Sequence, residues 1–229
     1  MQTSGKKLPG AYGANEPKQN AANLRTKGWE LMLTWNDAFK LANKPFRYNL
    51  SVGLADNTSE ITKFDNPSKI LSDYYVGQKL GDIWGYVVDG LFRTDEEAAN
   101  YNVDQTAVNF VINTAQVNPG LHAGDMKFVD LDGDHTISSG SNTADDPGDR
   151  KIIGNSLPRY TYSIQGGFDW YGFDFSIYLQ GVGHQDWYPG TNSVFFWGPY
   201  ARPYSSFIPR DFLSQVWSPE NPDAYFPRR

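Results

Sequence analysis

The chain has 229 residues, enough for one or two ordinary domains, and its 20 basic and 26 acidic side chains give a formal net charge of −6. No cluster of basic residues occurs, so nucleic acid is not an expected partner. Cysteine is absent, which excludes disulfides, thiolate metal sites and a cysteine nucleophile. Because no run of about 18 apolar residues is present, the sequence predicts no transmembrane helix, and residues 1–7 do not resemble a signal peptide.

Four segments alternate apolar and polar residues with a period of two, near 26–36, 46–56, 159–170 and 172–182. Side chains of a strand point alternately to its two faces, so each segment predicts a strand with one apolar and one polar face. Aromatic residues stand at the ends of these apolar faces. The apolar faces consist of Trp29, Leu31, Leu33 and Trp35, then Tyr48, Leu50, Val52 and Leu54, then Tyr160, Tyr162, Ile164, Phe168 and Trp170, and finally Phe173, Phe175, Ile177 and Leu179.

Apolar strand faces that end in aromatic residues are typical of a transmembrane β-barrel, in which aromatic girdles flank an apolar band. Such barrels have short periplasmic turns and long extracellular loops. The connectors follow this order, because a short connector over 37–45 and a tight turn near Tyr171 and Gly172 alternate with an extracellular loop over 57–158 and an outer loop or tail over 183–229. The sequence therefore predicts an all-β fold, an antiparallel transmembrane β-barrel fragment of about four strands.

A barrel cannot close with so few strands, and an open sheet edge in hydrocarbon leaves backbone groups without partners at several kcal/mol each. We therefore expect residues 1–229 to be part of a longer barrel, truncated at both ends. The long loop carries one short helix candidate over 94–101. Thr94 is its predicted cap, and Glu97 completes a capping box three residues later.

A calcium loop is predicted within the long loop. Asp130, Asp132 and Asp134 occupy positions 1, 3 and 5 of an EF-hand-like motif, and the backbone carbonyl of Thr136 would supply position 7. His135 stands where glycine normally permits the sharp turn, and Ser141 stands where a bidentate glutamate is usual. Among the later acidic residues, Asp149 is the favoured distant ligand. The alternative is a solvated acidic turn without metal.

No catalytic constellation is evident in the sequence. His122 and His184 have no acid and nucleophile at a recognisable spacing, and the glycine-containing segments lack the context of a phosphate loop. A glycoside hydrolase would need two matched carboxylates across a cleft, and no motif supports such a pair. We therefore do not expect an enzyme.

Several phrases together resemble the C-terminal part of SusC/RagA-type TonB-dependent outer-membrane transporters, in order over residues 8–182. They include Gly81-Asp-Ile-Trp-Gly-Tyr86, Asp89-Gly-Leu-Phe-Arg-Thr94, Gly124-Asp-Met-Lys-Phe-Val-Asp-Leu-Asp-Gly-Asp134, Ile153-Gly-Asn155 and Tyr171-Gly-Phe-Asp-Phe-Ser176. The resemblance implies a plugged outer-membrane barrel of about 22 strands that imports glycan fragments or peptides. It also implies a SusD-like surface lipoprotein as lid, and energy from the TonB complex through an N-terminal region absent from this chain.

Within such a transporter, one set of polar residues would face the lumen: Glu30, Arg47, Asn49, Gln165, Asp169 and Gln180. A set of loop aromatics is expected either to stack on sugars or contact the lid, or simply to pack the loop: Trp84, Tyr86, Phe92, Trp187 and Trp197. The alternative function for the whole chain is a secreted, calcium-stabilised, carbohydrate-binding β-sandwich, which would explain the aromatics and the acidic loop but not the ordered connector lengths.

Overall fold

The computed structural model describes residues 2–4, 18–20, 22–108, 120–190, 200 and 208–228. The chain divides into two compact units, and each is described by itself. The first consists of Met1–Lys69, Asp73–Asp82 and Gly154–Trp187, and the second of Ile70–Ser72, Ile83–Ile153 and Tyr188–Arg229. Among the described residues, no helix is long and apolar enough to cross a membrane.

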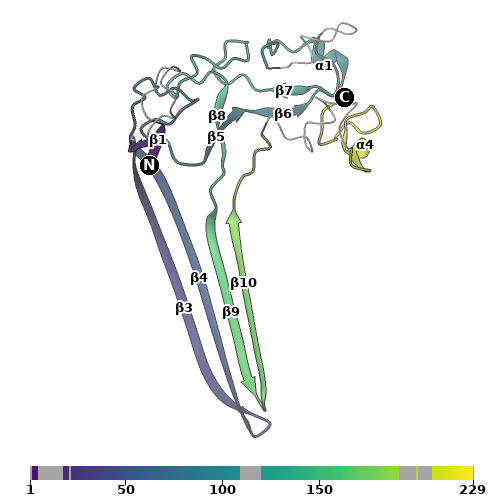
Figure 1. Cartoon of the computed structure of the whole chain (residues 1–229). Coiled ribbons are helices and arrows are strands. Elements are labelled where there is room, and N and C mark those ends of the chain that lie inside the picture. Colours follow the sequence, from purple (N-terminus) through teal and green to yellow (C-terminus); the bar gives the residue numbers. More distant parts are fainter. Residues whose placement is uncertain are drawn as a thin grey trace, which may run out of the picture. The chain divides into compact units, whose positions relative to one another are not determined.

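The first unit is built on a four-stranded antiparallel sheet with the strand order β10-β9-β4-β3, whose long strands lie side by side in Figure 1. A short pair, β1 (Gln2–Ser4) and β2 (Lys18–Asn20), accompanies it. The predicted all-β, antiparallel fold is confirmed. The sheet is open, and its strands are β3 (Asn23–Leu41), β4 (Lys44–Lys63), β9 (Arg159–Trp170) and β10 (Phe173–His184).

The first hairpin is longer than the sequence predicted. Only Ala42 and Asn43 lie between β3 and β4, so the connector expected over 37–45 shrinks to a tight turn. Both residues have positive φ, 48° and 60°. Two-residue turns that match the twist of a hairpin require this backbone conformation. The strands continue because Phe39 pairs with Phe46 and their rings lie 5.0 Å apart.

The second hairpin turns where the sequence indicated, at Tyr171 and Gly172, with φ of 52° and 85°. Between the two hairpins, β4 pairs directly with β9 from Phe46 opposite Trp170 to Ala55 opposite Thr161. The four strands thus follow one another as a meander, even though a long excursion separates β4 from β9. At the end of this pairing, Arg159 donates two hydrogen bonds of 2.6 Å to the carboxylate of Asp56.

The excursion predicted as one long loop contains regular structure of its own. Strands β5 (Asp82–Tyr86) and β8 (Arg150–Asn155) form one two-stranded sheet, and β6 (Val88–Leu91) and β7 (Met126–Phe128) form another. These strands have only three to six residues each, too short for the alternation that revealed the long strands. A second short helix, α4, covers Phe212–Gln215.

The predicted helix is confirmed as α1 (Asp95–Ala99). The Thr94 hydroxyl accepts a hydrogen bond of 3.1 Å from the Glu97 amide, as an N-cap does. The Glu97 carboxylate accepts from the Arg93 amide at 2.9 Å, one residue earlier than in the usual capping box. Both interactions satisfy backbone donors at the start of the helix.

The core of the second unit is small and aromatic. Phe92 is fully buried and meets Tyr101 edge-to-face with ring centroids 5.1 Å apart. The buried Gln105 amide donates to the Met126 carbonyl at 2.7 Å, and its oxygen accepts from the Phe128 amide at 3.2 Å. A buried polar group satisfied in this way fixes β7 without the penalty of an unpaired amide.

Candidate functional site

One face of the four-stranded sheet is apolar along its middle rows. Residues directly opposite each other on neighbouring strands share a face. The pairing registers therefore place the apolar residues of the four predicted segments on one face of the sheet. Its rows, from β3 to β10, are Leu31, Leu54, Tyr162 and Gly181, then Leu33, Val52, Ile164 and Leu179, then Trp35, Leu50, Gly166 and Ile177.

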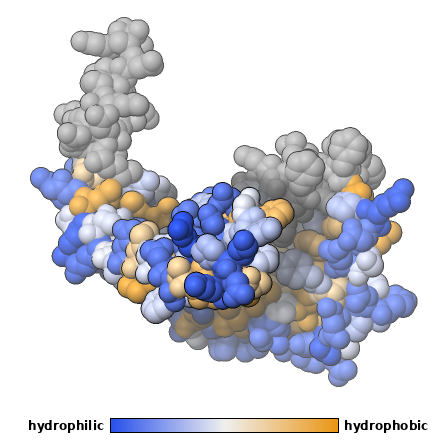
Figure 2. Space-filling view, turned by 90° about the horizontal axis from the view of Figure 1, so that it is seen from below, coloured by the Kyte–Doolittle hydropathy of each residue, from blue (hydrophilic) through white to orange (hydrophobic). Residues whose placement is uncertain are grey.

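This apolar face is open. Leu33 is 61% exposed, Trp35 62% and Phe173 71%, values that buried strands do not show. The strong contacts of the four strands are with one another, so in the described part of the first unit no second layer packs on them. Figure 2 shows apolar residues in orange at the molecular surface beside hydrophilic ones in blue. An uncovered apolar area of this kind marks a surface that meets a membrane or a partner.

Aromatic side chains gather at both ends of the apolar rows. Near the tight turns, Phe168 stacks between Phe46 and Phe175, with ring centroids 5.4 Å apart in each pair. At the opposite end of the rows lie Trp29 and Tyr160, each about half exposed. The apolar stretch is therefore bounded on both sides by rings, the arrangement that an interfacial girdle requires.

The other face of the sheet is polar. The six residues predicted to line a lumen all lie on it, because each pairs with members of the same face. Arg47, for example, stands opposite Asp169, and the Tyr178 hydroxyl donates to Gln180 at 3.2 Å. Glycine at position 53 leaves room on this face for the Ser163 side chain, since a Cβ there would lie only 2.7 Å from the Ser163 hydroxyl.

The edges of the sheet are free in the described structure. Strand β3 pairs only with β4 and β10 only with β9, so one side of each edge strand presents backbone groups without a strand partner among the described residues. Such edges accept further strands readily.

Three of the predicted metal ligands come together in the second unit. Carboxylate oxygens of Asp130, Asp132 and Asp149 all lie within 4.8 Å of one another. Asp149 is fully buried and accepts hydrogen bonds of 2.7 Å from the amides of Leu131 and Ser138. Its side chain thus ties the acidic loop to the segment that follows, and each oxygen retains a lone pair for a further ligand.

Asp134 lies outside this group of three and accepts a hydrogen bond from the Thr136 amide at 2.7 Å. His135 has a φ of 66°, the left-handed conformation for which glycine is usual at this position of the motif. The loop therefore makes its sharp turn despite the histidine. The Asp130 carboxylate stabilises that turn by accepting from the amides of Gly133 and His135 at 2.7 and 2.9 Å.

The electrostatics of the group differ between its members. The Asp134 amide lowers the pKa of Asp132, but burial and the neighbouring carboxylates outweigh it and raise that pKa above its ordinary value. For Asp130, burial raises the pKa, but hydrogen bonds from backbone amides dominate and hold it below the ordinary value. A donor set made only of carboxylate oxygens, with like charges crowded together, fits a hard cation such as Ca²⁺.

The loop aromatics separate into buried and exposed residues. Phe92 is fully buried, so of the roles expected for it the structure supports packing of the loop and not stacking on a sugar. Tyr86 packs edge-to-face on Phe128 at 6.0 Å, and the indole nitrogen of Trp84 is buried with no hydrogen-bond partner in the described structure. Trp187 is 74% exposed, whereas Trp197 lies outside the described residues.

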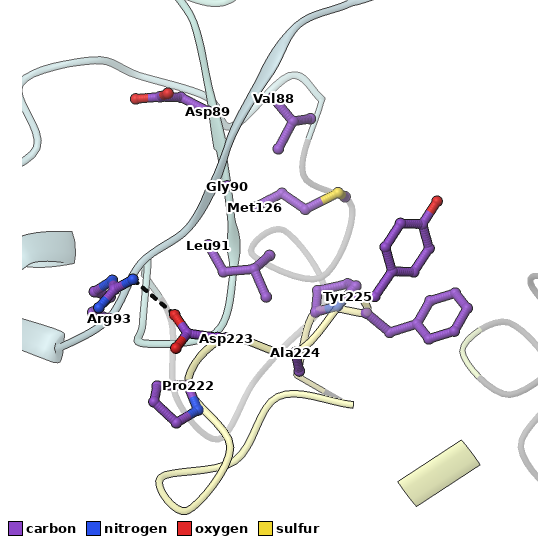
Figure 3. A pocket seen from close by; sticks show the side chains of 12 residues that line it. Val88, Asp89, Gly90, Leu91, Arg93, Met126, Pro222, Asp223, Ala224 and Tyr225 are labelled. Carbon is purple, nitrogen blue, oxygen red and sulfur yellow. Dashed lines mark hydrogen bonds and ion pairs between the residues drawn. The ribbon is translucent and has the colours of Figure 1, made fainter. Parts of the chain in front are cut away.

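The second unit also has a cavity of about 670 Å³ that sequence reasoning missed (Figure 3). Strand β6 and Met126 line one side of it, and residues 222–227 line the other. At its rim, Arg93 donates to Asp223 at 2.7 Å. No local motif could have indicated this cavity, because its two sides come from segments far apart in the sequence.

Fold and surface together define an all-β, meandering antiparallel sheet with one exposed apolar face and one polar face. Two curated proteins of Formosa agariphila resemble the chain. TonB-dependent receptor P39 is 27% identical over 193 residues, which cover 74% of this chain and 18% of the relative. TonB-dependent receptor P3 is 23% identical over 186 residues, which cover 76% of this chain and 16% of the relative. No family model matches the sequence.

These similarities support the assignment of the chain to a fragment of a TonB-dependent receptor, as the sequence motifs predicted. The chain spans less than a fifth of the length of the curated relatives it matches. Neither name specifies the SusC/RagA type, a substrate or a lipoprotein partner.

Proposed function

We propose that this chain is part of a SusC/RagA-type TonB-dependent transporter of the outer membrane, which imports glycan fragments or peptides. The observation that carries the proposal is the exposed apolar face bounded by rings, opposite a polar face on the same four strands. In a barrel wall, the apolar face contacts lipid and the polar face lines the lumen. The free sheet edges pair with further strands of the parent receptor, which satisfies their backbone groups.

The alternative, a secreted carbohydrate-binding β-sandwich, is less well supported. A sandwich buries the apolar faces of two sheets against each other. Here the apolar face of the sheet is open, and Leu33 and Phe173 are more than half exposed. A membrane interface also explains the aromatic rings at both ends of the apolar rows, whereas the core of a sandwich does not require them.

In the parent receptor, the polar face would contact the plug and the passing ligand through residues such as Glu30, Arg47 and Gln165. The partners in this proposal are a SusD-like surface lipoprotein as lid and the TonB complex, which acts through a region outside this chain. Loop residues are the ones available to the lid, and the exposed Trp187 is one candidate contact.

Fractionation and uptake test this function. The receptor that contains this chain should appear in the outer-membrane fraction, and its deletion should abolish import of a labelled glycan or peptide. Deletion of tonB should give the same loss, because the energy comes from the inner membrane. A receptor found only in the soluble fraction, or import that persists without it, would contradict the proposal.

We also propose that Asp130, Asp132 and Asp149 hold a structural Ca²⁺ in the second unit. The proximity of the three carboxylates and the turn at His135 support it. Thermal unfolding of the receptor should shift upward with CaCl₂ and downward with chelator. The shift should disappear in Asp132→Ala and persist in the control Glu220→Ala, whose side chain is exposed elsewhere in the same unit. Equal melting with calcium and chelator in the unmutated receptor would exclude the site.

A further inference from the structure

We propose that the cavity between β6 and residues 222–227 binds one ring of a neutral sugar. The inference rests on the proposed transport function and adds a capture site in the second unit. All residues that line the cavity belong to this one unit. Its volume of about 670 Å³ lies within the range of small-molecule sites, roughly 300–1,000 Å³.

The walls suit a ring with an apolar face. Leu91 and Met126 line one side, and Figure 3 shows them across the cavity from Tyr225. Tyr225 is 78% exposed, and its ring lies edge-on to that of Phe226 with centroids 5.0 Å apart. An exposed tyrosine ring offers a flat apolar surface, against which the C–H face of a pyranose can stack.

The rim disfavours an anionic ligand. Arg93 is paired with Asp223 at 2.7 Å. Because Arg93 is the cation among the lining residues and already faces a carboxylate, the lining offers no unpaired cation to a phosphate group. Guanidinium donors and carboxylate acceptors side by side match hydroxyl groups, which both donate and accept hydrogen bonds.

An extended peptide fits this cavity less well. Peptides commonly bind by adding a strand to a regular sheet edge. The register of β6 against β7 shifts between Val88 and Leu91, and Gly90 between them has a φ of 88°. The resulting kink breaks the straight ladder of backbone groups that such a peptide would need. A sugar ring does not need a straight strand edge, because it does not pair with backbone groups as a strand.

Calorimetric titration of the detergent-solubilised receptor tests the inference. The probes are neutral hexasaccharides with α-1,4-, β-1,3- and β-1,4-glucose and β-1,4-xylose linkages, together with an alanine- and leucine-rich hexapeptide. At least one saccharide should bind, and Tyr225→Ala should weaken it about tenfold, the loss expected for one aromatic stack. Tyr225→Phe should retain affinity because the ring remains, and Tyr188→Ala provides the matched control in the same unit, outside the cavity.

Three results would overturn the inference: no saccharide binds, the affinity is unchanged in Tyr225→Ala, or only the hexapeptide binds in a Tyr225-dependent way. Failure here is distinguishable from failure of transport. A receptor that imports its ligand but binds saccharide equally well with and without Tyr225 retains the proposed function and loses this site. A soluble chain that binds saccharide through Tyr225 loses the transport function and retains the site.

Discussion

Asp149 is the side chain on which the acidic loop depends. It is fully buried and accepts from the amides of Leu131 and Ser138. Removing its carboxylate leaves two backbone donors without their partner, and each buried unpaired group costs about 1–3 kcal/mol. Asp149→Ala should therefore lower the free energy of unfolding of this unit by roughly 2–5 kcal/mol, measured with chelator present to exclude any metal effect.

The control for this prediction is Glu220→Ala, an exposed acidic residue of the same unit. Surface substitutions of this kind usually change stability by no more than about 0.5 kcal/mol. Equal effects of the two substitutions would show that the buried hydrogen bonds of Asp149 do not hold the loop.

Glu97 provides a pH dependence with a defined sign. A hydrogen bond from the Arg93 amide, and then one from Lys127, lower its pKa below the ordinary value of 4.5. A depressed carboxyl pKa contributes stability above the unfolded value, and this contribution is lost as the pH falls through the folded value. Glu97→Gln should therefore destabilise the second unit near neutral pH, and the difference from the unmutated protein should shrink below pH 4.5. Denaturant unfolding across that range measures it, and a constant difference would contradict the prediction.

Part of the acidic site could be predicted from single residues. The spacing of Asp130 and Asp132 indicates a shared loop, and the sequence favours Asp149 as the distant ligand. The structure brings these three together. Asp134 was also expected, but its carboxylate accepts from the Thr136 amide and lies outside the group. Sequence spacing indicates which residues can converge, whereas the folded path of the loop decides which ones do.

At the scale of the strands, the two faces of β3 should respond differently to a substitution by arginine. Leu33 stands in the middle row of the apolar face, and its neighbour Thr34 stands on the polar face, where its hydroxyl meets Ser51 at 2.7 Å. An arginine on the lipid side near the bilayer midplane costs about 2–4 kcal/mol. Leu33→Arg should therefore reduce the amount of folded receptor in the outer membrane, whereas Thr34→Arg should be tolerated.

Quantitative blotting of heat-modifiable receptor in outer-membrane fractions compares the two variants. If Thr34→Arg lowers the level more than Leu33→Arg, the assignment of lipid and lumen faces is reversed or the sheet is not in a membrane.

The long strands were predictable because their alternation persists over many residues, and each side chain reports its face. The positions where these strands end were less predictable. Asp37 and Lys40 are polar and indicated a connector, yet both lie within β3, where the hairpin register and the Phe39–Phe46 contact extend the strand. Ala42 gave no turn signal, although it adopts positive φ. The short strands β5 to β8 depend on partners distant in sequence, and composition alone does not reveal them.

For the molecule as a whole, the open face and free edges predict how the 229-residue chain behaves by itself. Exposed apolar rows and unpaired strand edges promote association between copies. Expressed without the rest of the receptor, the chain should form aggregates in buffer and become dispersed in detergent. Size-exclusion chromatography under both conditions measures this, and a stable monomer in plain buffer would argue against the barrel wall proposed above.

The register between β4 and β9 has a consequence for how such receptors diversify. Phe46 faces Trp170 and Ala55 faces Thr161, although a long excursion separates the two strands in sequence. For a flexible connection, doubling its length costs only about 0.6 kcal/mol of closure entropy. Insertions and exchanges between these two strands therefore cost the sheet little, so in the transporter that we propose the ligand preference can evolve in that stretch while the apolar face is retained.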